Sequence, residues 1–288
     1  MAVLARRNLR LGRGDRRGAR NLALAAIVAQ TVGGALVAHP RLGILVDTLP
    51  HGLFLGLLAW LLYLGIEPAI RRTWPGLLTA WARLIDGRWR DPLVGRSLLV
   101  GVLVGLLVAP DWSVLLAGLL DLPGGGPYLL PWFGASVGGL NVFLGDRALV
   151  VATALELALL TQGVLLASRL VLRRARLAWA ATALVWLAWQ YSGVLSFTPA
   201  ISPWLSFSVS IAFTVVWVWL LAKHGAVAMA TGWFVAASVG NAPWTLDASR
   251  WYAWRGPFMM VIAAALAFWG FRNVLGKQSA FPTGALDG

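Results

Sequence analysis

The stretch LVGRSLLVGVLVGLLVA, from Leu93 to Ala109, carries a single charged side chain, Arg96, among residues that are otherwise apolar or small. A helix rises about 1.5 Å per residue, so this run nearly matches the roughly 30 Å hydrocarbon core of a bilayer. Arg96 lies near its start, where a long side chain can reach the headgroups. Asp91 and Pro92 precede the run as a predicted N-cap and first helical residue. We therefore predict a transmembrane helix over Leu93–Ala109.

Other apolar runs follow the same pattern on both sides of this stretch. The sequence thus predicts an all-α, polytopic membrane protein with eight transmembrane helices. The glycine pairs Gly52/Gly56 and Gly101/Gly105 should let helices approach closely, and the shortest run, rich in small residues, should pack inside the bundle. The other predicted helices are Asn21–Ala38, Leu49–Ile66, Ala148–Val171, Leu177–Phe197, Pro203–Leu221, Ala226–Val239 (the shortest) and Pro257–Phe271.

The composition supports this class of protein and excludes others. Of the 288 residues, 59% are hydrophobic and 12% charged, with a mean hydropathy of +0.75; soluble domains are roughly 45–50% apolar and about 25% charged. A disordered chain is excluded because 17 Trp residues and long aliphatic runs would not stay solvated. Without cysteine there are no disulfides, cysteine-ligated metals or thiol nucleophiles. We predict no cofactor.

The distribution of charge predicts the orientation of the chain. With a cytoplasmic N-terminus, the eight-helix topology places 20 of the 24 Lys and Arg residues on the cytoplasmic side, in line with the positive-inside rule. Residues 1–20 then form a basic cytoplasmic tail, 21–272 a single membrane domain and 273–288 a short cytoplasmic tail, with an extracytoplasmic loop over 110–147. The net charge of +13 is therefore a topology signal, and we predict no nucleic-acid partner.

A basic segment after the second predicted helix has the pattern of a helix that lies on the cytoplasmic membrane surface. Over Leu77–Trp89, apolar residues recur at intervals of three and four, with arginines between them. The bilayer and its anionic lipids are therefore expected partners. The alternative is a static basic belt that only sets topology. The candidate residues for contact with a cytoplasmic partner are Glu67, Arg71, Arg72, Arg83, Arg88, Arg90 and Arg96; Glu67 should also pair with Arg71, one turn later.

One acidic residue, Glu156, falls in the middle of a predicted span. A carboxyl group at that depth is costly to expose to lipid, so it should face the helix bundle, with Gln162, Thr153 or an adjacent helix as its partner. A hydrogen-bonded packing role and a proton or ion relay are both open interpretations. A metal site formed by His39, Asp47 and His51 is a weaker alternative.

Five phrases are distributed along the chain: ARRNLRLGRGDRRGA (5–19), LLYLGIEPAIRRTWP (61–75), GRWRDPLVGR (87–96), LDASRWY (246–252) and WGFRNVLG (269–276). Together they resemble the C-terminal membrane region of a group of bacterial transmembrane serine/threonine protein kinases. In that group a cytoplasmic kinase domain precedes a multi-helix membrane unit. The similarity covers nearly the whole chain, from about Ala5 to Phe281.

The resemblance implies a membrane anchor or sensory module in the bacterial inner membrane, with both termini in the cytoplasm and a kinase as partner. It carries over no catalytic residue, because the sequence has no His-Arg-Asp or Asp-Phe-Gly motif. The glycine-rich phrase Gly12–Gly18 lacks the spacing and the preceding strand of a nucleotide loop. We therefore expect a module that is not catalytic by itself. The alternatives are a small-molecule transporter and a non-catalytic subunit of a larger membrane complex.

Overall fold

The computed structural model describes residues 2–37, 47–109, 138–197, 203–244 and 247–276. Every regular element in these ranges is helical, which confirms the predicted all-α class. The elements are α1 (Ala2–Arg10), α2 (Arg16–Val37), α3 (Leu49–Thr73), the 3-10 turn η2 (Pro75–Leu77), α4 (Thr79–Ile85), α5 (Pro92–Val108), α8 (Leu140–Leu172), α9 (Ala175–Phe197), α10 (Pro203–Gly240) and α11 (Arg255–Leu275).

Five helices in the described ranges are long and apolar enough to cross a membrane. They are α2, α3, α8, α11 and the part of α10 from Phe207 to Gly240. Helix α5 is also apolar but has 17 residues, or about 25 Å of helix. These lengths are those of a multi-pass membrane protein, whereas the count of eight spans stays a prediction.

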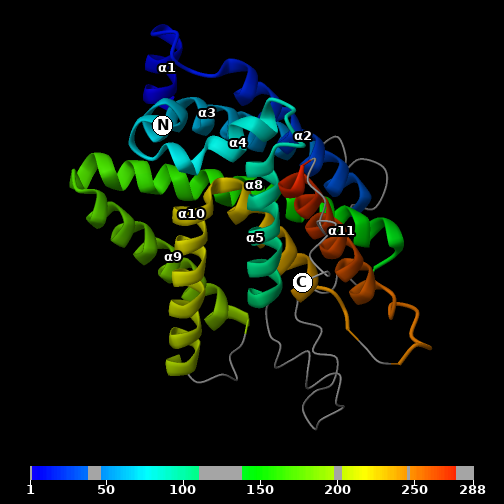
Figure 1. The fold of residues 1–288 in the computed structure, drawn as a ribbon. Coiled ribbons are helices and arrows are strands. Elements are labelled where there is room, and N and C mark those ends of the chain that lie inside the picture. The colour runs from blue at the N-terminus through cyan, green and yellow to red at the C-terminus, as the bar shows by residue number, and fades with distance from the viewer. Residues whose placement is uncertain (1, 38–46, 110–137, 198–202, 245–246, 277–288) are drawn as a thin grey trace, which may run out of the picture.

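The helices pack as two groups. Helix α2 packs against α3 and α8, while α5 packs against α10 and α11. The two groups are joined where α8 meets α10, where α9 packs against both of these helices, and where η2 contacts both α3 and α10. Figure 1 shows α5 and α10 side by side, with α8 crossing near the upper end of α10. Helix α1 lies outside both groups, at the end of the molecule formed by α3.

The predicted glycine pairs lie where two helices approach closely. A Cβ atom added at Gly101 would lie 2.7 Å from the carbonyl oxygen of Ala228. One added at Gly105 would lie 2.6 Å from that of Gly232. The pair on α3 faces α2 in the same way. The prediction of close approach is therefore confirmed, and it shows how α5 and α10 pack backbone against backbone.

The predicted break between Leu221 and Ala226 is present as a sharp bend inside α10. Gly225 has φ 80° and ψ −174°, a backbone conformation that is essentially limited to glycine. The helical segment after the bend is largely buried, including Ala226, Ala228 and Met229. This confirms that the small-residue segment packs inside the bundle.

Several predicted boundaries were wrong, because packing extends the helices. Helix α3 continues through Pro68 to Thr73 instead of ending at Ile66. Helix α8 begins at Leu140, so Arg147 belongs to a helix rather than to the loop, whose residues 110–137 lie outside the described ranges. The basic tail 1–20 contains α1 and the first turn of α2, and α11 extends past residue 272.

The predicted surface helix over Leu77–Trp89 was wrong in length and in what it contacts. The segment forms η2 and the short helix α4, and Gly87 then turns the chain with φ 81°. Leu77, Leu78 and Trp81 are only 3%, 1% and 2% exposed. The apolar face of α4 thus packs into the protein, because α10 lies against it.

Tryptophan is not confined to the membrane interfaces that its abundance suggested. Trp186 and Trp189 of α9 form a cluster with Trp217 and Trp233 of α10, with ring centroids 5.1 to 6.4 Å apart. The indole N–H of Trp186 donates to the hydroxyl of Thr161 at 3.0 Å. The cluster therefore joins α8, α9 and both parts of α10 from within.

Candidate functional site

Pro68 lies inside α3, near its end. A proline lacks the backbone N–H that would bond the carbonyl four residues earlier, which here belongs to Leu64. Asn8 of α1 supplies the missing donor: its Nδ2 donates to the carbonyl oxygen of Leu64 at 2.8 Å and to that of Gly65 at 3.3 Å. The helix is therefore stabilised through Pro68 by a side chain from α1. We call this contact the α1–α3 joint.

A cluster of four ionisable side chains adjoins the α1–α3 joint. Tyr63 is fully buried, and its hydroxyl donates to Asp15 at 3.4 Å. Glu67 pairs with Arg71 at 2.5 Å, as predicted; the Glu67 side chain is 5% exposed and that of Arg71 is 49% exposed. Arg71 also interacts with Tyr63. The cluster links the segment between α1 and α2 to the end of α3.

Asp15 has a second role, as the residue that starts α2. Its Oδ1 accepts a hydrogen bond from the N–H of Gly18 at 2.8 Å, the geometry of an N-cap. A Cβ atom at Gly18 would collide with the Asp15 carboxylate. The glycine- and arginine-rich phrase Gly12–Gly18, which has some features of a nucleotide-binding loop, thus forms the start of α2.

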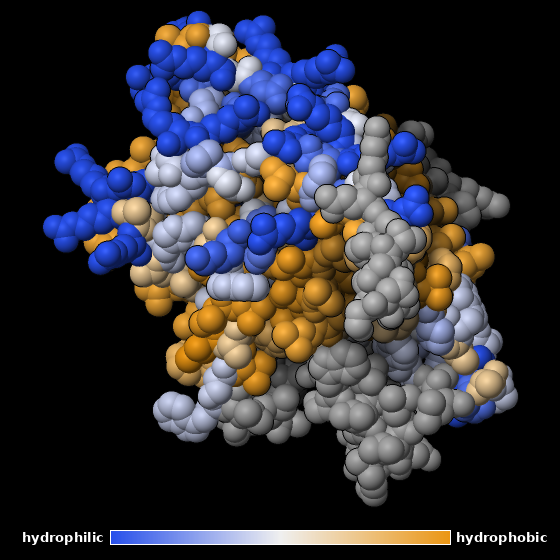
Figure 2. All heavy atoms as spheres, in the orientation of Figure 1, coloured by the Kyte–Doolittle hydropathy of each residue, from blue (hydrophilic) through white to orange (hydrophobic). Residues whose placement is uncertain are grey.

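The arginines of α1 and of the start of α2 form an exposed surface at this end of the molecule. Arg71 and Arg72, at the end of α3, are exposed beside it. Figure 2 shows hydrophilic residues gathered over this end, above a broad apolar surface. We call this surface the N-terminal basic face; it comprises Arg6, Arg7, Arg10, Arg13, Arg16, Arg17, Arg20, Arg71 and Arg72.

Arg83, predicted as a contact residue, pairs with a carboxylate of this chain, and its side chain is 35% exposed. Its Nη1 lies 2.7 Å from each carboxylate oxygen of Asp91, which also accepts the N–H of Leu93 at 2.9 Å as the predicted N-cap of α5. Burial alone would raise the pKa of Asp91, but the hydrogen bonds from Arg83 and Leu93 hold it below its usual value. Asp91 is therefore ionised at neutral pH, and the pair fixes α4 against the start of α5.

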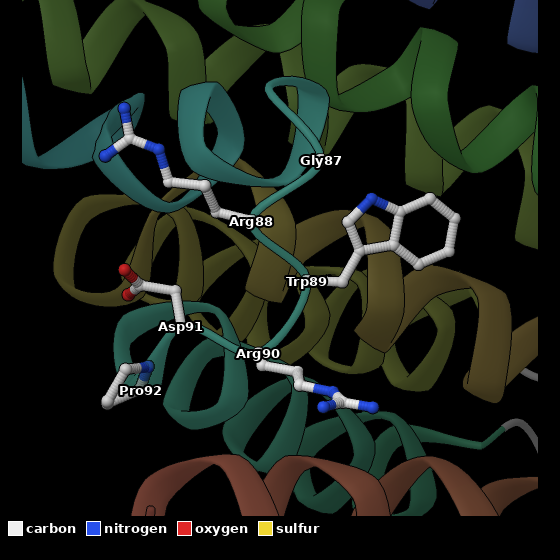
Figure 3. Close-up of a pocket in the computed structure, with 6 residues that line it drawn as sticks. All are labelled: Gly87, Arg88, Trp89, Arg90, Asp91 and Pro92. Carbon is white, nitrogen blue, oxygen red and sulfur yellow. The ribbon is translucent and has the colours of Figure 1, made fainter.

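The other predicted contact residues are exposed and dispersed. Arg88 lies 3.9 Å from Asp86, and both side chains are open to solvent. Arg96, on α5, is exposed within electrostatic reach of His224. Arg88 and Arg90 belong to the turn between α4 and α5 and extend in different directions from it (Figure 3). The predicted set thus divides between the end of α3, the Arg83–Asp91 pair, this turn and α5.

Glu156 and Gln162, both on α8, do not form a shared site. Gln162 is fully buried, and its Nε2 donates to the carbonyl oxygen of Ala158 at 3.0 Å. Glu156 is partly buried, and its Oε1 has no hydrogen-bond partner among the described residues. No group of three metal-binding side chains occurs in the described ranges, and His39 lies outside them. The predicted polar pair is therefore two separate positions on one helix.

Two buried arginines near the starts of α8 and α11 escaped the sequence analysis. Arg147 is 6% exposed and donates to the carbonyl oxygen of Ser238 at 2.9 Å, while Arg255 is 1% exposed. Their guanidinium groups lie 5.4 and 5.1 Å from the ring centroid of Phe143, and that of Arg255 lies 4.6 Å from that of Trp251. The aromatic residues that precede Arg255 could have predicted its position, because an arginine side chain stacks on such rings.

The N-terminal basic face presents exposed guanidinium groups, which can bind carboxylates and phosphates through two parallel hydrogen bonds. The α1–α3 joint connects α1 to α3, a helix long and apolar enough to cross a membrane. Comparisons with protein families, with curated proteins and with solved structures found no match to this chain. The function of this end therefore has to be argued from its own geometry.

Proposed function

We propose that the chain is a membrane-anchoring and sensory module, not catalytic by itself, whose N-terminal basic face contacts a cytoplasmic protein kinase. The observation that carries this proposal is the 2.8 Å hydrogen bond from Asn8 to the Leu64 carbonyl that Pro68 leaves free. That bond ties an arginine-rich surface helix to an apolar helix of spanning length. A partner that holds α1 is then mechanically linked to α3, as a sensory module requires.

The placement of the kinase-like phrases supports the proposal. Residues 5–19 and 61–75 supply the two sides of the α1–α3 joint and its ionisable cluster. Residues 87–96 and 269–276 also meet, where the side chain of Asn273 donates to the carbonyl oxygen of Trp89 at 2.9 Å. Phrases that are far apart in the sequence thus contact one another in the fold, and the first two of them lie at the N-terminal basic face, where the kinase is proposed to bind.

Charge reversal tests the proposed contact. We expect the chain, purified in mild detergent from its own cells, to retain a kinase that is detectable by ATP-dependent phosphorylation. The triple variant Arg6→Glu/Arg7→Glu/Arg10→Glu should reduce kinase recovery by at least about tenfold, because like charges across an interface repel. The matched control carries the same charge change at three exposed arginines where α8 gives way to α9: Arg173 and Arg174 in the turn, and Arg176 at the start of α9.

The thermal unfolding midpoints of the two triple variants should agree, so that a loss of kinase reports on contact and not on folding. Equal recovery with both triple variants would contradict a contact through α1. Recovery of no kinase with the unaltered chain would contradict the proposed partner itself.

Single cysteines test the orientation that this proposal needs, because the chain has none of its own. We expect Ser249→Cys, in the exposed turn before α11, to react with a membrane-impermeant maleimide in intact cells. Thr73→Cys, at the exposed end of α3, should react only after the membrane is permeabilised. The positive-inside distribution is the physical reason. Labelling of Thr73→Cys alone in intact cells would place the N-terminal basic face outside.

A further inference from the structure

The turn between α4 and α5 forms a shallow, open hollow of about 470 Å³, lined by residues 87–92. Figure 3 shows the side chains of Trp89 and Arg90 on one side of the turn and those of Arg88 and Asp91 on the other. The hollow therefore presents the indole of Trp89 and the guanidinium of Arg90 on one side, and the guanidinium of Arg88 on the other (Figure 3). It is separate from the N-terminal basic face.

The backbone of this turn is held in place from three directions. Asn273 of α11 donates to the carbonyl oxygen of Trp89 at 2.9 Å, and the N–H of Arg88 donates to the carbonyl oxygen of Arg83 at 2.9 Å. The Arg83–Asp91 pair anchors the end of the turn. The arginines of the hollow thus project from a fixed base, which lowers the entropy lost when they bind an anion.

The acidic residue of the hollow does not compete for these arginines. The carboxylate of Asp91 is occupied by Arg83 and by the N–H of Leu93. Arg90 is exposed and forms no ion pair within the described residues. Arg88 reaches Asp86 only at 3.9 Å, between two exposed side chains, and such a pair contributes little. Positive charge is therefore available to an external anion.

The position of the hollow shows what kind of anion it fits. The indole of Trp89 is 57% exposed, and its ring centroid lies 6.4 Å from that of Trp269 on α11. Tryptophan collects at the boundary between headgroups and acyl chains, and apolar α5 and α11 begin and end beside this turn. Exposed apolar residues follow at once, with Leu93 40% exposed on α5. The hollow therefore suits a ligand that has an anionic head and an apolar tail, because the tail would lie against these exposed apolar residues.

We propose that residues 87–92, together with the end of α11, bind the headgroup of an anionic phospholipid. The phosphate pairs with Arg90, on the same side of the turn as Trp89, while Arg88 adds positive charge from the other side (Figure 3). The glycerol and upper acyl chain lie along Trp89 and Trp269. The proposal does not depend on a kinase partner, because none of these residues belongs to the N-terminal basic face.

Native mass spectrometry of the purified chain with added phosphatidylglycerol tests this site, with phosphatidylcholine as the neutral probe. We expect Arg88→Gln/Arg90→Gln to weaken phosphatidylglycerol binding by about fivefold for each arginine, the size of one lysine or arginine near an anionic surface. Arg88→Lys/Arg90→Lys keeps the charge and should retain most of the binding. The matched control, Arg174→Gln/Arg176→Gln, removes the same charge from an exposed position elsewhere and should bind like the unaltered chain.

Two further outcomes separate this site from its alternatives. Equal binding by both glutamine variants would overturn it, because the lipid would then follow net charge. Displacement of phosphatidylglycerol by equimolar glycerol 3-phosphate would also overturn it, because the site would then recognise a soluble phosphate. A thermal unfolding midpoint equal to that of the unaltered chain shows that the arginine variants are folded.

Discussion

Gly225→Ala is expected to lower the free energy of unfolding by about 2–4 kcal/mol. Gly225 has φ 80° and ψ −174°, where any side chain strains the backbone. A Cβ atom there would also lie 2.9 Å from the carbonyl oxygen of Leu77 and 3.0 Å from that of Gly76. The bend must therefore open, and with it the contact between α10 and η2. The thermal unfolding midpoint in mild detergent measures the loss.

Gly76→Ala is the matched control for this variant. It changes a glycine on the other side of the same contact, where an added Cβ meets nothing within 4 Å. Surface substitutions of this kind usually alter stability by less than about 0.5 kcal/mol. If Gly225→Ala were as stable as Gly76→Ala, the bend would not need glycine, and α10 would not be fixed by η2.

Arg71→Ala is expected to destabilise the fold by about 2 kcal/mol, because it leaves the buried carboxylate of Glu67 without its cation. Removal of one partner from a fully buried pair costs roughly 3–5 kcal/mol. The Arg71 side chain is 49% exposed while that of Glu67 is 5% exposed, so the loss here should be smaller. The variant should also loosen α1, and proteolysis within residues 2–10 would report this.

Arg72→Ala provides the control, since Arg72 is exposed and adjacent in the same helix. The double variant Glu67→Gln/Arg71→Ala should recover part of the stability, because a neutral amide is less costly to bury than a carboxylate. If Arg71→Ala and Arg72→Ala had the same effect, the Glu67–Arg71 pair would have no structural role.

Positions of apolar helices could be predicted from the sequence where local signals mark their ends. The predicted helix Leu93–Ala109 agrees with α5, Pro92–Val108, within one residue at each end. Asp91 and Pro92 explain this accuracy, because an N-cap and an N1 proline act within a few residues. The bend at Gly225 was found for a similar reason, since a charged and glycine-containing gap separates two apolar runs.

Features that depend on distant residues could not be predicted. Pro68 suggested a helix end, and the donor that lets α3 continue is Asn8, 56 residues before the carbonyl it bonds. The amphipathic pattern of α4 identified an apolar face but not what covers it, and α10 rather than lipid does so.

The sequence predicted which residues belong to the candidate site better than it predicted which of them contact one another. The Glu67–Arg71 pair follows from helical spacing alone, so the sequence was sufficient for it. Asp15 was missed as a member of the same cluster because it is far from Glu67 in the sequence and meets it only through folding. Tyr63 lies one helical turn before Glu67, so helical spacing could have identified it. Arg83 seemed equivalent to Arg88 and Arg90 in a charge pattern, yet Asp91 holds it.

The contact between Asn8 and Leu64 also sets an order of events during synthesis. Helix α1 is made before α3, and the carbonyl that Asn8 bonds lies 56 residues later in the chain. Helix α1 can therefore dock only after α2 and most of α3 have been made. Docking of α1 thus requires that α3, the second helix of the α2–α3 hairpin, has formed. Until then α1 is undocked, and a newly made chain is exposed to proteolysis there.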